Sequence, residues 1–481
     1  MKTLGELIAN NNLTSEEKNI QIENLSQHSK SCRENSLFFC INGTQVNGED
    51  YAYEAVKNGA VAVVTETKIA NLEVPQIVVK NVRSEMAHIA NRFYNSANKL
   101  KIIGITGTNG KTTTNYMLYK VLTSCGKKVG LIGTNEVIIG TNHIPAKLTT
   151  PDPIELHNLF YHMLKEHVEW VVMEVSAHAI ALNKIAGIKF KCGIFTNCTQ
   201  DHLDFFKDML NYEQTKINFF NSKFCENCCV NADSETGRII ARTTNIDNCA
   251  TYGIDNPSNC FAINISQSLT KSQFTVNMFD EIENFSLNIG GEHNIYNALA
   301  CISCLGLLGF KIEDIKQGLE KFKSPAGRFN IIKNKLGATI ILDFAHTPDA
   351  LIKMFKATTP FKKNRIITVF GATGNRDKLK RGSMGKIIES YSDIFFLTSD
   401  SPDTENPQDI ANQVLNGVKN KEKVKVILDR KECVNQSINI LTKGDILLVL
   451  GKGTENYQII NGEKRPYNDE EVINQALNKR N

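Results

Sequence analysis

A strand that runs directly into a glycine-rich turn and then into a helix is the feature that most constrains the fold of this chain. The apolar run Lys101–Ile105 predicts the strand, the segment Gly104–Thr113 contains the turn, and Asn115–Ser124 has helical spacing. Two further apolar runs, Trp170–Val175 and Cys192–Thr196, follow with helical patterns between them. Strands that alternate with helices in this way indicate a parallel sheet covered by helices.

The alternation extends along all 481 residues and predicts an α/β protein of three domains. Residues 1–99 are expected to form a small mixed α/β domain, and residues 100–325 a central domain with a mostly parallel sheet. Proline and glycine in Lys323–Gly327 mark the start of a third domain, 326–481. Five strand-like runs lie beyond this break: Thr339–Leu342, Ile366–Phe370, Asp393–Leu397, Val424–Leu428 and Ile446–Leu450.

Composition narrows the classes of function. Apolar residues make up 41% of the chain and charged residues 22%, which is typical of a globular protein. A net charge of +4 is too small to predict binding to nucleic acid or to a membrane surface. The apolar runs are far shorter than the roughly 20 residues of a membrane helix, and the N-terminus lacks an apolar signal core. We therefore expect a cytoplasmic protein with no membrane span, and a monomer.

Thirteen cysteines, an odd number at scattered positions, argue against a disulfide framework. Cys225, Cys228 and Cys229 form a cluster, but no second pair stands at the spacing of a structural zinc site. Cys301 and Cys304 fall in an apolar pattern typical of a buried helix. We expect these thiols to lie in the core.

The glycine-rich turn has the chemistry of a phosphate-binding loop. Glycines let backbone N–H groups face phosphate oxygens, and the N-terminus of the following helix adds positive potential. Lys111 would reach the terminal phosphates and Thr112 would bind Mg²⁺. The strict Gly-x₄-Gly-Lys-Thr pattern is not met, because Ile105 holds the first glycine position. The loop alone predicts a nucleoside triphosphate and leaves GTPases, helicases and ATP-dependent ligases open.

Further motifs decide between these classes. They are Thr106–Thr113, Met173–His178, Asn197–Asp204, Gly291–Ala300, Gly327–Phe329, Asp343–Leu351, Val369–Asp377 and Gly451–Glu455. In order and spacing they resemble the Mur ligases of peptidoglycan synthesis, and within these the MurE branch, the UDP-N-acetylmuramoyl-tripeptide synthetases. The resemblance covers essentially the whole chain.

The resemblance implies a reaction and an architecture. The first domain would bind a UDP-sugar, the central P-loop-type domain ATP, and the Rossmann-like third domain an amino acid. The enzyme would join UDP-N-acetylmuramoyl-L-alanyl-D-glutamate to a diamino acid, with ATP and Mg²⁺. A carboxylate is a poor electrophile, so ATP would convert it to an acyl phosphate that the incoming amine attacks, and the protein would mainly position and neutralise charge.

The same resemblance implies roles for individual residues. The expected catalytic residues are Lys111, His202 and Lys216, with Lys216 modified to a carbamate (N6-carboxylysine). The expected metal ligands are Thr112, Glu174, His202 and carbamylated Lys216. The expected ATP contacts are Gly107, Thr108, Asn109, Gly110, Lys111, Thr112, Thr113, Asn294, Arg328 and Asp343. The expected UDP-sugar contacts are Ser29, Thr44, Gln45, Thr149, Thr150, Ser176 and Lys184. The expected amino-acid contacts are Arg376, Asp400, Asp403, Gly451 and Glu455.

Several positions depart from the family pattern. Lys30 and Lys184 stand where the family carries arginine, which keeps the charge and loses the bidentate fork. Phe206 replaces a family histidine, and no role is assigned to it. Asp403 stands where diaminopimelate enzymes have an arginine that holds the distal carboxylate. A carboxylate there would repel a second carboxylate and attract an ammonium. We therefore predict L-lysine, or ornithine, with meso-diaminopimelate as the alternative.

Three other classes of protein share some of these features. A folylpolyglutamate synthase shares the loop but lacks a UDP-binding domain, which residues 1–99 supply. The amidotransferase partner subunit MurT would need a zinc ribbon. A non-catalytic Mur-like binding protein would have no reason to keep Lys111, Glu174, His202 and Lys216 together.

Overall fold

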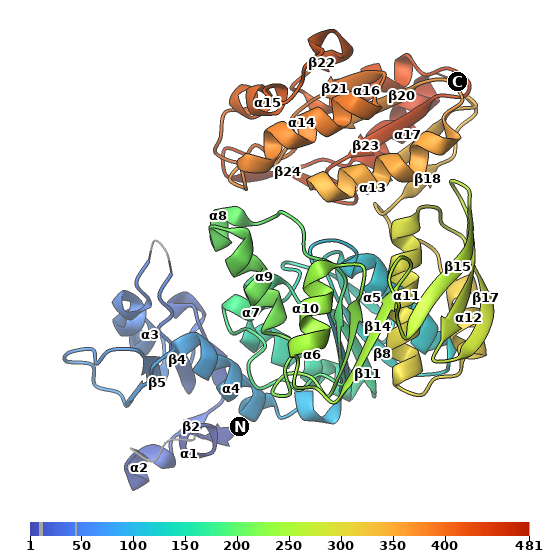
Figure 1. Cartoon of the computed structure of the whole chain (residues 1–481). Helices are drawn as coiled ribbons and strands as arrows, with labels where there is room; N and C mark the ends of the chain where they lie inside the picture. The colour runs from blue at the N-terminus through green and yellow to red at the C-terminus, as the bar shows by residue number, and fades with distance from the viewer. Residues whose placement is uncertain (9–12, 44–45, 481) are drawn as a thin grey trace.

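The computed structural model describes residues 1–8, 13–43 and 46–480, in which three sheet-containing regions follow one another along the chain (Figure 1). The N-terminal region, in blue, lies beside the central region, and the C-terminal region, in orange and red, lies above it. The fold class predicted from the sequence is confirmed by this succession of sheets. Two predicted positions, Thr44 and Gln45, lie outside the described residues.

The N-terminal region is built on a parallel sheet in the order β3-β4-β5-β6. One face of this sheet buries Leu37, Phe39 and Val64 in a cluster with Ile89 of helix α4. A short antiparallel pair, β1-β2, precedes the sheet. The elements are β1 (Lys2–Thr3), α1 (Leu4–Leu7), α2 (Ser15–Lys18), β2 (Gln21–Ile22), β3 (Asn24–Ser26), β4 (Ser36–Phe39), α3 (Ala52–Lys57), β5 (Ala60–Thr65), β6 (Gln76–Val78) and α4 (Val82–Tyr94).

The central region holds an eleven-stranded sheet in the order β10-β9-β8-β11-β7-β12-β13-β14-β15-β16-β17. Strand β7 lies in its middle and pairs in parallel with β11 and β12, so the carboxyl ends of these strands share one edge. The elements are β7 (Lys101–Thr106), α5 (Lys111–Ser124), β8 (Val129–Ile132), β9 (Glu136–Ile139), β10 (Asn142–Pro145), α6 (Pro153–Lys165), β11 (Trp170–Glu174), α7 (Ala177–Ala181), β12 (Cys192–Phe195), α8 (Leu203–Phe206), α9 (Met209–Ile217), β13 (Asn227–Asn231), α10 (Glu235–Thr243), β14 (Asn248–Gly253), β15 (Cys260–Gln267), β16 (Ser272–Met278), β17 (Glu281–Leu287), α11 (Glu292–Leu307) and α12 (Ile312–Glu320).

The three strands β15, β16 and β17 are an antiparallel extension that the sequence analysis did not anticipate. Their signal is present in the sequence as a period-two pattern: Phe274, Val276 and Met278 of β16 are buried and the residues between them are not. Such alternation is typical of a sheet with only one covered face, whereas the inner strands of the parallel sheet are apolar throughout. Helices α11 and α12 cover the buried face.

The C-terminal region has a six-stranded sheet in the order β18-β19-β23-β20-β21-β22, parallel except for β18. A separate hairpin, β24-β25, follows it. The elements are β18 (Asn330–Ile332), β19 (Thr339–Asp343), α13 (Pro348–Thr358), β20 (Ile366–Phe370), α14 (Leu379–Tyr391), β21 (Ile394–Leu397), α15 (Pro407–Leu415), β22 (Val424–Val426), α16 (Arg430–Asn439), β23 (Ile446–Leu450), β24 (Tyr457–Ile460), β25 (Glu463–Pro466) and α17 (Asp469–Arg480).

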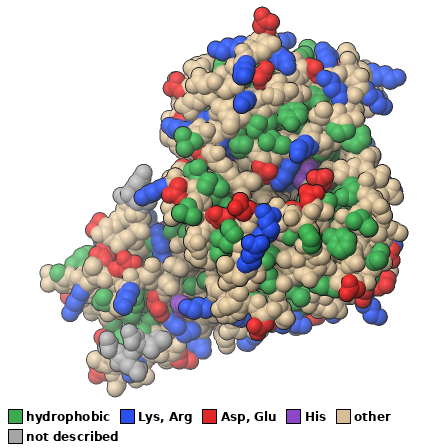
Figure 2. All heavy atoms as spheres, viewed as in Figure 1, with side chains coloured by type: hydrophobic (Ala, Val, Ile, Leu, Met, Phe, Trp, Pro, Cys, Tyr) green, Lys and Arg blue, Asp and Glu red, His purple; other side chains and the backbone are tan. Residues whose placement is uncertain are grey.

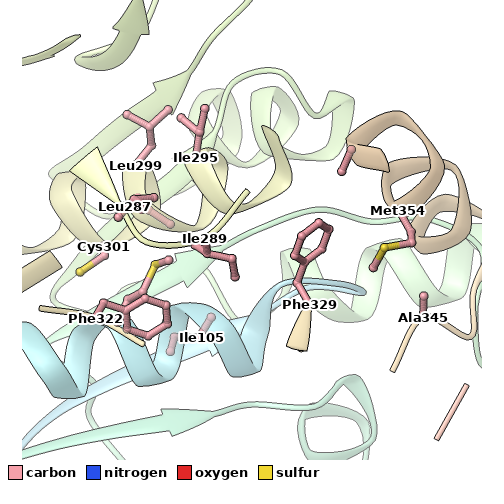
Figure 3. Packing of buried hydrophobic residues seen from close by; sticks show 14 of the residues in the cluster. Ile105, Leu287, Ile289, Ile295, Leu299, Cys301, Phe322, Phe329, Ala345 and Met354 are labelled. Atoms are coloured by element: carbon pink, nitrogen blue, oxygen red, sulfur yellow. The ribbon is translucent and has the colours of Figure 1, made fainter. Parts of the chain in front are cut away.

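One apolar cluster crosses from the central to the C-terminal region. Figure 3 shows Phe329 and Met354 of the C-terminal region near Ile289 and Ile295 of the central region, and all four belong to the same buried cluster. Burial of apolar surface between two regions holds them together. The site described below lies beside this junction.

Cys225, Cys228, Cys229, Cys301 and Cys304 are buried and free, as predicted. In the described part of the chain, no group of side chains has the make-up of a metal-binding cluster of histidine, cysteine and acidic residues. Of the helices that the structure describes, none combines the length and apolar character that a membrane crossing needs.

Candidate active site

The glycine-rich loop connects β7 to α5 at the carboxyl edge of the central sheet. Gly107 and Gly110 have φ angles of 146° and 90°, a region that side chains other than glycine rarely enter. A Cβ atom at Gly107 would also collide with the Thr196 hydroxyl of the neighbouring strand end. The loop therefore needs glycine at these positions, and helix α5 begins at Lys111 with its N-terminus facing the turn.

Lys111 is folded back onto the loop. Its ammonium donates hydrogen bonds to the carbonyl oxygens of Gly107, at 2.7 Å, and Thr108, at 2.9 Å. Burial lowers the pKa of this amine, while the Glu174 and Asp201 carboxylates act in the opposite direction. A phosphate group that replaced the two carbonyls would supply full negative charge to this desolvated cation.

The side chains of Thr112, in the first turn of α5, and Glu174, at the end of β11, are in contact. The Thr112 hydroxyl donates to a Glu174 carboxylate oxygen at 3.1 Å, and Glu174 is fully buried at the end of β11. The same carboxylate accepts hydrogen bonds from the backbone N–H and hydroxyl of Thr134. A hydroxyl and a buried carboxylate side by side are oxygen ligands of the kind that Mg²⁺ prefers, so these two residues fit the metal that the sequence implied.

A cleft of about 450 Å³ opens from this loop toward the C-terminal region. Figure 2 shows a hollow between the two regions where basic, acidic and histidine side chains gather. Six of the predicted ATP contacts line it, together with other residues from both regions; the six are Asn109, Gly110, Thr113, Asn294, Arg328 and Asp343. The volume falls in the range of small-molecule sites.

Arg328 and Asp343 belong to the C-terminal region and line this cleft from that side. The Arg328 guanidinium donates to the Thr112 hydroxyl at 3.1 Å and lies 4.5 Å from the centre of the Phe344 ring. Asp343 accepts hydrogen bonds from the backbone N–H groups of Phe329 and Ala345, both at 2.7 Å. Burial raises the pKa of the Asp343 carboxyl, and the Arg328 charge opposes that shift.

His202 lies at the N-terminus of α8 with a φ of 57°, in the left-handed region. Its ring stands edge-on to His178, with centroids 4.8 Å apart, and its Nε2 atom is 3.4 Å from the Asp201 carboxylate. Burial lowers the pKa of His202 to about 3 despite that carboxylate. A neutral imidazole is the form that binds a metal ion.

Lys216 is fully buried on α9. Its Nζ atom lies 2.9 Å from the centroid of the Tyr212 ring and has no hydrogen-bond partner among the described residues. The Tyr212 hydroxyl, in turn, is 3.2 Å from the Thr108 hydroxyl of the loop. Burial drives the pKa of the Lys216 amine well below its usual value. A desolvated amine with no hydrogen-bond partner among the described residues fits the carbamate that the family resemblance implies.

The predicted UDP-sugar contacts form two groups. Thr149, Thr150 and Ser176 lie beside the metal-type site: the Thr150 hydroxyl donates to the Glu174 carbonyl at 2.9 Å, and the Thr149 and Thr134 hydroxyls are 3.1 Å apart. The Lys184 ammonium pairs with Asp152 at 2.8 Å. Ser29 is separate from these, buried in the N-terminal region and bonded to Glu54.

Asp152 is a residue that sequence reasoning left without a role. It pairs with Lys184 and also accepts a hydrogen bond from Gln27 of the N-terminal region at 3.3 Å. Because Gln27 lies two residues before Ser29, this contact connects the two groups of sugar-binding candidates. Asp152 follows the predicted contacts Thr149 and Thr150 closely in the sequence, but a pairing across 125 residues cannot be read from spacing.

Asp400, Gly451 and Glu455 converge on a lysine that the sequence analysis overlooked. The Lys452 ammonium is fully buried, 3.3 Å from Asp400 and 2.8 Å from Glu455. Burial alone would lower the pKa of Lys452, but these two carboxylates raise it. The motif Gly451-Lys452-Gly453 held the signal: a lysine between two glycines at a strand end. Arg376 is exposed nearby, close enough for its charge to act on both Tyr457 and His178.

Asp403 is held by its backbone rather than its side chain. Its N–H donates to Ile459 at 2.9 Å and its carbonyl accepts from Asn461 at 2.7 Å, so it pairs with the β24-β25 hairpin. Its φ of 55° is left-handed, a conformation that aspartate tolerates better than most residues. The side chain is half-buried. A preference for lysine requires the Asp403 side chain to point at the distal end of the amino acid, and this backbone pairing does not impose that direction.

Comparisons with known proteins cover nearly the whole chain. Three family models match consecutive segments: "Mur ligase family, catalytic domain" at residues 21–94, "Mur ligase middle domain" at 105–305 and "Mur ligase, glutamate ligase domain" at 327–453. The match at residues 21–94 speaks against the folylpolyglutamate synthase alternative, which was expected to lack this part.

Two curated relatives are similar over almost their full length. UDP-N-acetylmuramoyl-L-alanyl-D-glutamate--2,6-diaminopimelate ligase 1 of Clostridium acetobutylicum is 39% identical over 466 residues, 95% of each chain. The enzyme of the same name, without the final numeral, from Clostridioides difficile is 38% identical over 467 residues, 96% of each chain. A solved structure of a ligase with this name superposes with a TM-score of 0.71 at 25% identity, covering 100% of this chain and 99% of the other. All three names contain diaminopimelate, so they do not support the L-lysine or ornithine preference predicted from Asp403, and the alternative fits them better.

Proposed function

Because the chain belongs to the Mur ligase family, we propose that it is an ATP-dependent ligase that adds meso-diaminopimelate to UDP-N-acetylmuramoyl-L-alanyl-D-glutamate. The observation that carries the choice of substrate is the 39% identity, over 95% of both chains, to a relative with that named activity. The proposal replaces L-lysine as the first expectation. L-lysine stays the second candidate, and the single observation in its favour is the carboxylate of Asp403.

The arrangement of the site supports a ligase that uses ATP and Mg²⁺. In this proposal the loop Gly107–Thr113 binds the phosphates, Lys111 neutralises the terminal one, and Asn294, Arg328 and Asp343 complete the nucleotide cleft. Thr112 and Glu174 would hold one Mg²⁺, and His202 with carbamylated Lys216 would support a second. When bound, Mg²⁺ supplies positive charge that offsets the crowding of phosphate and carboxylate oxygens.

The substrates would approach from two sides. Ser29, Thr149, Thr150, Ser176 and Lys184 are proposed to bind the UDP-sugar, with Thr44 and Gln45 as further candidates. Arg376 would hold the α-carboxylate of the amino acid, and Asp400, Gly451 and Glu455 would line its pocket. The domain bounds 1–99, 100–325 and 326–481 would then correspond to sugar, nucleotide and amino-acid binding. A nucleotide sugar and ATP are metabolites of the cytoplasm, which is where we expect the protein to act, as a monomer.

The test is a competition assay. Purified protein is incubated with ATP, Mg²⁺, the UDP-sugar dipeptide and an equimolar mixture of meso-diaminopimelate, L-lysine and L-ornithine, and the products are separated by mass. We expect the diaminopimelate product to dominate, with ADP formed in step. Lys111→Met is the matched negative control. A dominant lysine product would restore the charge argument from Asp403, and no product with any diamino acid would refute the ligase.

A further inference from the structure

A buried ion pair joins the central and C-terminal regions at the candidate active site. The Lys380 ammonium, at the start of α14, lies 2.7 Å from the Asp201 carboxylate, which follows β12. Their side chains are 8% and 7% exposed. The two residues are 179 positions apart, so the pair exists only when the two regions are in contact.

Other polar contacts cross between the regions at the same place. Gln200, next to Asp201, donates to the Asp377 carboxylate at 3.3 Å. Asn109 of the glycine-rich loop donates to Asp349 at 2.9 Å and to the Thr347 hydroxyl at 3.2 Å. Asp201 also has His202 and His346 beside its carboxylate, but of these contacts between the regions only the Lys380–Asp201 pair joins two full charges that are both removed from water. Removal of the Asp201 carboxylate would therefore leave the Lys380 ammonium buried without its partner.

Each end of the pair is attached to a different part of the candidate active site. On the central side, Asp201 accepts a hydrogen bond from the backbone N–H of His202 at 3.0 Å, and its second oxygen is 3.4 Å from the His202 ring. This carboxylate thus fixes a residue whose left-handed backbone would otherwise be unfavourable. On the C-terminal side, the chain runs from Arg376 through Asp377, whose carboxylate accepts from the Leu379 N–H at 2.9 Å, to Lys380.

We propose that Lys380 is a positioning residue for the ligation step. By pairing with Asp201, it holds the segment that carries Arg376, the candidate contact of the amino acid, against the segment that carries His202, the candidate metal ligand. The inference rests on the proposed function and goes beyond it by assigning a role to a residue outside the binding lists. Lys380 acts through Asp201 and does not touch the substrates. Without it, the amine and the activated carboxylate would each still bind, but at an uncontrolled separation, and intramolecular geometry of this kind carries a large share of a rate enhancement.

The experiment compares Lys380→Met, Lys380→Arg, the neutral pair Asp201→Asn with Lys380→Met, and Lys386→Met as a control on the exposed face of the same helix. Small-angle scattering of the ligand-free proteins measures whether the regions stay docked. Hydroxylamine trapping without amino acid measures formation of the acyl phosphate, and steady-state kinetics measure the complete reaction. For Lys380→Met we expect a larger radius of gyration, trapping within about threefold of wild type and kcat reduced by about 10- to 100-fold, with Lys380→Arg partly restored and Lys386→Met unchanged.

The neutral pair separates positioning from simple loss of folding. If Lys380→Met unfolds but the neutral pair folds and remains slow in the complete reaction, the proposal stands. Full recovery of kcat in the neutral pair would overturn it, as would an equal loss in trapping and in the complete reaction. Wild-type protein that traps nothing and ligates nothing would instead refute the proposed function, and the scattering comparison would still decide whether the pair docks the two regions.

Discussion

The Nζ atom of Lys216 lies over the face of the Tyr212 ring, 2.9 Å from its centroid, with no hydrogen-bond partner in the part of the chain that the structure describes. An ammonium there would be desolvated without a counter-charge, which is costly. The pKa of the amine is accordingly driven far down by burial. A neutral amine can add to CO₂, releasing one proton and leaving an anionic carbamate.

We predict that Lys216 carries this carbamate. Protein equilibrated with ¹³C-bicarbonate should give one carbamate carbon signal that Lys216→Ala lacks, and Lys216→Ala should lose about 100-fold or more in kcat because a charge at the reacting centre is missing. Lys191→Ala, which removes an exposed lysine paired with Glu226, should keep full activity. An active Lys216→Ala variant would contradict the assignment.

Thr112 should set the magnesium requirement. Thr112→Val keeps the shape of the side chain and removes the hydroxyl that lies beside Glu174 and Arg328. We expect the Mg²⁺ concentration for half-maximal activity to rise by about tenfold or more, measured as ADP release at fixed ATP. Thr112→Ser retains the hydroxyl and should stay near wild type. Equal Mg²⁺ dependence in both variants would show that the Thr112 hydroxyl is not a ligand of the metal.

Glu405 should make the C-terminal region acid-sensitive. The hydrogen bond from Arg381 is the main cause that lowers the pKa of Glu405 to about 2. Since the folded-state pKa is depressed, the stabilisation is complete above the unfolded value near 4.5 and disappears as the pH falls toward 2. Near the surface we expect about 1–2 kcal/mol, less than the full shift implies. The difference in unfolding free energy between wild type and Glu405→Gln should therefore be complete at pH 6, shrink below pH 4.5 and be largely lost only as the pH reaches about 2; a constant difference would contradict this origin.

The Asp403 carboxylate should lower kcat/KM for diaminopimelate relative to that for lysine, without abolishing the reaction of diaminopimelate. Asp403→Asn keeps a residue suited to the left-handed backbone and removes the charge. We expect the ratio of kcat/KM for diaminopimelate to that for lysine to rise by about 3- to 10-fold, as for a partly screened like-charge contact. Asp409→Asn, exposed on α15, is the matched control. An unchanged ratio would mean that the Asp403 side chain does not face the substrate.

The buried pair between Arg430 and Asp469 should be the largest single polar contribution to the stability of the C-terminal region. Both side chains are fully buried and joined at 2.7 Å, which fastens helix α17 to α16. Asp469→Asn leaves an uncompensated guanidinium, at a cost of about 3–5 kcal/mol. Calorimetry should show the transition of this region lowered by roughly 10 °C. Lys316→Ala, which breaks a half-buried pair with Glu283 in the central region, should shift it by little.

Local patterns predicted the strands around the site well. Lys101–Ile105, Cys192–Thr196 and Ile446–Leu450 match β7, β12 and β23 to within a residue, because inner parallel strands are continuous apolar runs bounded by turns. The one-sided strands β15 to β17 were missed, since Ile263 of β15 and Ile282 of β17 are apolar yet exposed and so interrupt the alternation.

The site divides in the same way. Residues within a motif, such as Lys111 and Thr112, lie where their spacing suggested. Contacts between distant motifs, including Lys452 with Asp400 and Lys380 with Asp201, depend on how two sheets are placed against each other. Nothing in the local sequence encodes that placement, and the charge argument from Asp403 failed to find support for the same reason: it fixed the type of residue but not its direction.

Arg328 connects the boundary between the central and C-terminal regions to the glycine-rich loop. It follows Gly327, where the path turns into the C-terminal region, yet its guanidinium ends on the Thr112 hydroxyl. Any swing of that region about the glycine must withdraw a positive charge from the loop. The affinity of the loop for an anion and the angle between the two regions are thus coupled reciprocally. A tightly bound polyanion favours the angle at which Arg328 contacts the loop. A molecule bound behind the Phe344 ring that changed this angle would lower the affinity for the polyanion without touching it.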